Sequence, residues 1–89
     1  MQKLTMLGSH LCQDCIYAIA KLKDEFDGMH IEFRNISTDF SALKDFMRLC
    51  ESEPMFAAPK EANQLGIPFF QLEDGTQTFS LQEVIEKLK

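Results

Sequence analysis

The sequence lacks features that mark two large classes of protein. None of its 89 residues belongs to an apolar run of about 18, the length that a membrane-spanning helix needs. Basic clusters are missing as well, because Lys21 and Lys23 are followed at once by Asp24 and Glu25, and the formal net charge is −5. These absences argue against membranes and nucleic acid as partners.

Cysteine is also scarce, with one residue each at positions 12, 15 and 50. An odd count does not suit a small secreted scaffold, in which disulfides normally pair every cysteine. The first seven residues are too short and too broken an apolar stretch for a signal peptide. We therefore expect a cytoplasmic protein with reduced thiols, and we expect Cys50, which ends an apolar helix face, to pack in the core.

Repeats, linkers and low-complexity segments are missing too, so residues 1–89 are expected to form a single domain. Periodicity and turn signals predict strands at 3–7, 29–36, 66–72 and 76–79, helices at about 13–26, 40–50 and 81–88, and a helical turn near 60–65. Asp74-Gly75 predicts a two-residue hairpin, and Ser80 with Glu83 predicts a capping box. The inward face of the second helix is expected to be Phe40, Leu43, Phe46 or Met47, and Cys50. A helix that connects two strands indicates parallel pairing and an α/β fold.

The motif that carries chemistry is Cys12-Gln13-Asp14-Cys15, which follows the first strand and opens the first helix. Two cysteines three residues apart on a first helical turn can form a disulfide. A helix N-terminus favours the reactive thiolate over the thiol. The spacing suits thiol–disulfide exchange, with Cys12 as the nucleophile and Cys15 as the thiol that resolves the mixed disulfide.

Other readings of the same residues are open. Two buried small side chains would be inert, although the polar Gln13 and Asp14 indicate an exposed turn. With His10, the two cysteines offer three donors of the kind that Zn²⁺ or Cu(I) accepts, so a soft-metal or iron–sulfur binding protein is the alternative from another class. A haem site is excluded because Ile16 stands where the motif requires histidine.

The CxxC at the head of the first helix, Gly66-Ile67-Pro68 at the start of the third strand, and the Asp74-Gly75 hairpin before a final helix together resemble the glutaredoxins. The resemblance covers nearly the whole chain. It implies a thioredoxin-like fold, with a four-stranded mixed sheet flanked by about three helices. It also implies that Pro68 is cis and lies beside Cys12, and that the backbone of Ile67 pairs with an extended disulfide substrate.

The resemblance further implies a small dithiol oxidoreductase that takes part in cellular redox homeostasis by electron transfer to protein or glutathione mixed disulfides. Cys12 and Cys15 would form the redox-active disulfide, and no bound metal or organic cofactor is expected. Glutathione or a reductase would supply electrons, and a variant of this reading is a monomeric redoxin serving one partner enzyme and reduced by a protein similar to thioredoxin reductase.

The chain departs from the family pattern at several positions. Gln13-Asp14 replaces the usual Pro-Tyr, and Ser9 stands where a lysine is frequent. Where the family has two glycines, a small residue and an aspartate that hold the γ-glutamyl end of glutathione, this chain has Phe79, Ser80, Leu81 and Gln82. We therefore expect weak glutathione binding and a larger or protein disulfide as the substrate.

Overall fold

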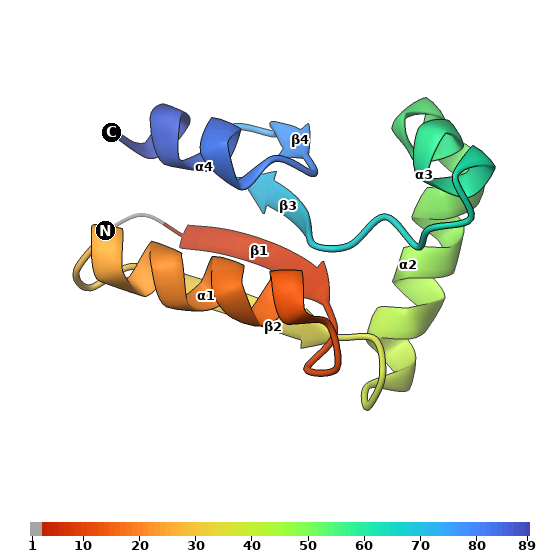
Figure 1. The fold of residues 1–89 in the computed structure, drawn as a ribbon, viewed down its shortest axis with the longest axis horizontal. Coiled ribbons are helices and arrows are strands. Elements are labelled where there is room, and N and C mark those ends of the chain that lie inside the picture. The colour runs from red at the N-terminus through yellow and green to blue at the C-terminus, as the bar shows by residue number, and fades with distance from the viewer. Residues whose placement is uncertain (1–2) are drawn as a thin grey trace.

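A computed structural model describes residues 3–89 and has an α/β architecture (Figure 1). Met1 and Gln2, which belong to the segment considered for a signal peptide, lie outside the described residues. The elements in chain order are β1 (Lys3–Gly8), α1 (Gln13–Glu25), β2 (His30–Asn35), α2 (Phe40–Ser52), the 3₁₀ turn η1 (Pro54–Phe56), α3 (Ala57–Glu61), β3 (Phe69–Leu72), β4 (Gln77–Thr78) and α4 (Leu81–Leu88). In this range there are four α-helices, where about three were expected, because α3 is a separate short helix.

The sheet is four-stranded within the described range and mixed, with the strand order β2-β1-β3-β4. β1 pairs with β2 in parallel, from Lys3 opposite His30 to Gly8 opposite Asn35, and α1 makes the crossover between them. β3 pairs with β1 in the antiparallel sense, with Leu7 opposite Phe69. The parallel pair predicted from the sequence is thus confirmed. The antiparallel pair brings the end of β1 and the start of β3 to the same end of the sheet.

Side chains alternate across the sheet and build one core on each face. Leu4, Met6 and Phe70 pack with Cys15, Ala18 and Leu22 of α1 and with Val84 and Ile85 of α4. On the other face, Leu7 and Phe69 pack with Ala42 and Phe46 of α2 and with Phe56 of η1. The adjacent Phe69 and Phe70 therefore serve opposite faces. Figure 1 shows α2 and α3 grouped at one end of the strands, away from α4.

The predicted inward face of α2 is confirmed at Phe46 and at the partly buried Cys50, which pack on the α2 side of the sheet, and is wrong at Phe40 and Met47. Ala42 and Phe46 are its buried residues, whereas Phe40 and Met47 are 72% and 56% exposed. The ring of Phe46 meets Phe56 edge-on, with centroids 5.7 Å apart, and this contact with η1 sets the rotation of the helix. Asp39 caps α2, because its Oδ1 accepts hydrogen bonds from the N–H groups of residues 41 and 42.

Two further corrections concern the second half of the chain. The helical turn expected near 60–65 is a helix at 57–61, preceded by the 3₁₀ turn that Pro54 begins. The hairpin has a three-residue loop, because the N–H of Leu72 donates to the carbonyl of Thr76 and Gly75 has a φ of +92°. A glycine with positive φ at this place is typical of a type I turn followed by a bulge. Its strands, at 69–72 and 77–78, are shorter than the predicted 66–72 and 76–79.

Candidate active site

Cys12 is the N-cap residue of α1 and is partly exposed. Its backbone is extended, with φ −98° and ψ 117°, and its Sγ accepts a hydrogen bond of 3.3 Å from the backbone N–H of Cys15. N-caps are usually serine, threonine, aspartate or asparagine, whose oxygen atoms satisfy free N–H groups of the first turn. Here a sulfur atom takes that place, so Cys12 Sγ lies beside an N–H donor at the positive end of the helix dipole.

Cys15, in contrast, is completely buried on the side of α1 that faces the sheet. Burial, followed by a hydrogen bond between its side chain and that of Cys12, raises the pKa of Cys15 to about 12. Its Sγ fits because position 8 is glycine, where a Cβ atom would lie 2.7 Å from this sulfur. At neutral pH Cys15 is therefore a protonated thiol beneath an accessible Cys12, and both cysteines are unpaired in this structure.

The loop before Cys12 is tied to the loop after β2. Ser9, which is 5% exposed, has its hydroxyl 2.6 Å from that of Ser37 and accepts a hydrogen bond from the N–H of Leu11. His10 Nδ1 lies 2.8 Å from Nδ2 of Asn35, whose Oδ1 already accepts from the N–H of Ser37. The Asn35 amide must therefore donate to His10. These bonds fix the approach to Cys12, a role for Ser9 and His10 that the sequence alone did not indicate.

A groove of about 380 Å³ opens beside the start of α1, and it contains one of the predicted substrate-binding residues, Ile67. Its lining residues are Asp14, Pro59, Gln64, Leu65, Gly66, Ile67 and Phe79. The Ile67–Pro68 peptide bond is cis, as the resemblance implied. Ile67 and Cys12 both pack against the core on the α1 face of the sheet. Pro59, Gln64 and Leu65 were missed because their segment has no periodic pattern.

Several apolar side chains next to Cys12 and in the groove are unusually exposed. Leu11 and Leu65 are 75% and 62% exposed, and Ile16, one helical turn after Cys12, is 53% exposed. Tyr17 is also exposed, as expected from its position on α1. Single exposed apolar residues are normal, but several close to one reactive side chain indicate an interaction surface. In the described residues, the main-chain N–H and C=O of Ile67 make no hydrogen bond.

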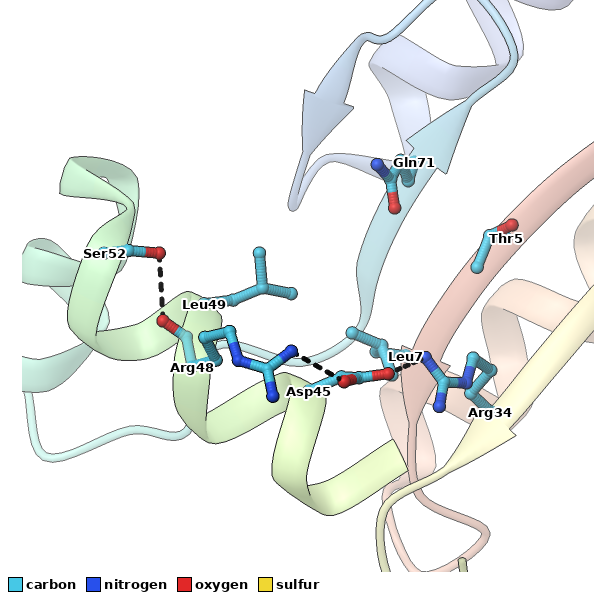
Figure 2. Close-up of a pocket in the computed structure, with 8 residues that line it drawn as sticks. All are labelled: Thr5, Leu7, Arg34, Asp45, Arg48, Leu49, Ser52 and Gln71. Carbon is cyan, nitrogen blue, oxygen red and sulfur yellow. Dashed lines mark hydrogen bonds and ion pairs between the residues drawn. The ribbon is translucent and has the colours of Figure 1, made fainter. Parts of the chain in front are cut away.

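A second cavity, of about 350 Å³, lies on the other face of the sheet between α2 and the strands (Figure 2). Arg34 Nη1 lies 2.6 Å from Asp45 Oδ2, and Arg48 Nη1 lies 3.2 Å from Oδ1 of the same carboxylate. The hydrogen bond from Arg34 lowers the pKa of Asp45. Thr5 and Gln71 face this space from β1 and β3. No cysteine or histidine lines this cavity among the residues the structure describes.

Comparisons with known proteins give no information about this site. No protein-family model, curated protein or solved structure matches the chain. Within residues 3–89, no helix is both long and apolar enough to cross a membrane. In the same range, no three histidine, cysteine, aspartate or glutamate side chains converge in a way that could hold a metal ion.

Proposed function

We propose that this chain is a small thiol–disulfide oxidoreductase of the glutaredoxin type, with Cys12 as the nucleophile and Cys15 as the resolving thiol. The observation that carries the proposal is the contrast between a partly exposed sulfur at the N-cap of α1 and a buried thiol one turn later. Such an asymmetric pair suits exchange, because one sulfur can meet a substrate while the other stays protonated until it is needed.

The architecture also supports the proposal, which includes a thioredoxin-like fold. The CxxC motif begins the crossover helix between two parallel strands, and the segment with Ile67 and Pro68 leads into the antiparallel β3 next to β1. Helices pack on both faces of the sheet. The free main-chain groups of Ile67 are suited to pair with an extended substrate, in the manner of an added strand.

The reaction has two exchange steps. In the first, the Cys12 thiolate attacks one sulfur of the substrate disulfide, a mixed disulfide forms, and the other substrate sulfur leaves as a thiolate that takes a proton from water. In the second, Cys15 loses its proton and attacks Cys12 Sγ, which releases the second substrate thiol. Two electrons pass to the substrate, and the Cys12–Cys15 disulfide is then reduced by an external thiol or dithiol.

Trapping experiments test these roles. We expect iodoacetamide at pH 7 to alkylate Cys12 at least tenfold faster than Cys15, because Cys12 is accessible whereas Cys15 is buried and its raised pKa keeps it protonated. Cys15→Ser protein should accumulate a mixed disulfide with a disulfide peptide, whereas Cys12→Ser should accumulate none at these positions. Mass spectrometry of the peptides measures both results, and Cys50→Ser serves as the matched control.

Two outcomes would contradict the proposal. In one, Cys15 of the Cys12→Ser protein reacts quickly while Cys12 of the Cys15→Ser protein is inert, which would reverse the roles. In the other, the wild type fails to exchange with any disulfide and, when purified anaerobically, holds stoichiometric soft metal or the visible absorbance of an iron–sulfur cluster. That result would assign the two thiolates to binding instead of catalysis.

A further inference from the structure

We propose that the groove beside Cys12 selects protein disulfides flanked by basic and apolar residues and excludes glutathione. The inference rests on the proposed oxidoreductase function and concerns its substrate class. It follows from three features: the charge of the groove, its closed end at β4 and α4, and the exposed apolar side chains of Leu65 in the groove and Leu11 next to Cys12.

The groove carries negative charge and has no compensating cation. Asp14, an exposed residue between the two cysteines, is the one ionisable side chain among the described residues that line it. Glutathione has more carboxylates than ammonium groups, so it is an anion at neutral pH. An anionic ligand next to Cys12 would be repelled by Asp14, whereas a lysine or arginine beside the reacting cysteine would be attracted.

The end of the groove near β4 is closed to a small peptide ligand. The ring of Phe79 packs edge-on against Phe56, with centroids 5.0 Å apart, and lies 5.9 Å from the ring of Phe69. Phe79 is thus held in an aromatic cluster with the residues that fill the α2 side of the sheet. It occupies its place firmly, because a move would also disturb this packing.

Donors at the start of α4 are already used within the chain. The N–H of Ser80 donates to the Thr78 hydroxyl at 3.0 Å, and that hydroxyl donates to Glu83 Oε1 at 2.7 Å. The N–H of Glu83 in turn donates to Ser80 Oγ at 3.1 Å. Two of the N–H groups that could hold a ligand carboxylate are therefore occupied, and the Glu83 carboxylate adds negative charge at this helix end.

Exposed apolar side chains next to Cys12 and in the groove are suited to a protein chain. Leu11 precedes Cys12 and is 75% exposed, and Leu65 in the lining is 62% exposed. Covering these two side chains requires apolar groups on either side of the substrate cysteine, which the tripeptide does not have. Burial of such side chains is favourable in proportion to the apolar area removed from water.

The test measures the first exchange step with matched probes. Cys15→Ser protein reacts with thionitrobenzoate mixed disulfides of three thiols: acetyl-Lys-Leu-Cys-Leu-Lys-amide, acetyl-Glu-Leu-Cys-Leu-Glu-amide and glutathione. Absorbance of released thionitrobenzoate gives the rates, and Cys12→Ser protein corrects for reaction at Cys50. At low ionic strength we expect the basic peptide to react about fivefold or more faster than the other two. In about 1 M salt, where the screening length is about 3 Å, the difference should shrink.

Two aspartates on α1 provide a matched pair of variants. Asp14→Asn should reduce the preference for the basic peptide to about twofold or less. Asp24→Asn removes the same charge from the far end of the helix, about 15 Å along its axis, and should leave the preference unchanged. Replacing Leu65 with Ser should slow the reaction of both peptides that have leucine next to cysteine. It should not slow the reaction of the corresponding peptides with glycine in place of leucine.

The outcomes separate this inference from the proposed function. If the glutathione conjugate or the acidic peptide reacts as fast as the basic peptide, the substrate class is wrong while the oxidoreductase function stands. An equal loss of the preference for the basic peptide in Asp14→Asn and Asp24→Asn would assign the effect to net charge and would contradict a role for the groove in selection. If none of the three probes reacts at Cys12, the proposed function itself fails.

Discussion

Cys12 and Cys15 are one helical turn apart, yet their environments differ at the residue scale. The sequence order and the helix N-terminus led to the prediction that Cys12 attacks, because the first residue of such a motif precedes the helix. The complete burial of Cys15 could not be predicted, since it depends on a glycine in another element, Gly8. Long-range contacts of this kind leave no local signal in the sequence.

The raised pKa of Cys15 predicts a loss of stability of the reduced protein at alkaline pH. An unfolded thiol has a pKa of about 8.5, and the folded value is about 12, so the unfolded chain releases its proton first. The stabilising contribution is therefore complete below about pH 8.5 and is lost as the pH rises toward the folded value. Between these limits the free energy of unfolding should fall by up to about 1.4 kcal/mol per pH unit from this group alone.

Urea unfolding of the reduced protein from pH 8 to pH 11 measures this slope. Cys15→Ala protein is the control, because it keeps the other alkaline groups and loses only this one. The wild type should show the steeper decline, and parallel declines in the two proteins would show that Cys15 does not remain protonated in the fold.

At the element scale, the sequence predicted the order of strands and helices well where the period was regular. The helix at 13–25 and the cap at Ser80 lie where they were expected, because capping residues and apolar spacing are local signals. The full face of α2 and the exact place of the helix at 57–61 were not predicted, since both depend on how Phe56 packs against Phe46 and Phe69.

The contact between the end of β1 and the start of α1 leads to a prediction for Gly8. A Cβ atom there would lie 2.7 Å from Cys15 Sγ and 3.2 Å from the ring of Phe33. Gly8→Ala should therefore displace α1 from the strand and lower the free energy of unfolding by about 1–3 kcal/mol, as overpacking does. It should also slow release of the mixed disulfide, because Cys15 would no longer lie directly below Cys12.

A double-mutant cycle tests the cause. In the Cys15→Ala background the sulfur is gone, so the same change at position 8 should cost markedly less stability in urea unfolding. Equal costs in both backgrounds would show that the crowding comes from Phe33 or the backbone instead.

For the whole molecule, the two faces of the sheet are covered to different extents. On the α1 and α4 face, the core extends along both strands and includes Leu4 and Met6 of β1 and Phe70 and Leu72 of β3. On the α2 face, packing is confined to the end near Leu7 and Phe69, and Thr5 and Gln71 line an open cavity (Figure 2). This difference could not be predicted, because periodicity reports which side of an element is apolar and not how far a helix extends over a sheet.

Because this cavity separates α2 from much of the sheet, the ion pair of Arg34 with Asp45 is an important link between β2 and α2. We expect Asp45→Asn to lower the free energy of unfolding at pH 7. Arg34 lowers the pKa of Asp45, so its contribution is present above the unfolded value of about 3.9 and is lost as the pH falls through the lower folded value. The gap between wild type and variant should therefore narrow from pH 7 to pH 2 in urea unfolding. As a control, the rate of Cys12 alkylation should be the same in the variant, because Cys12 lies on the other face of the sheet. A stability difference between wild type and variant that stays constant at all pH values would show that Asp45 acts through packing and not through its charge.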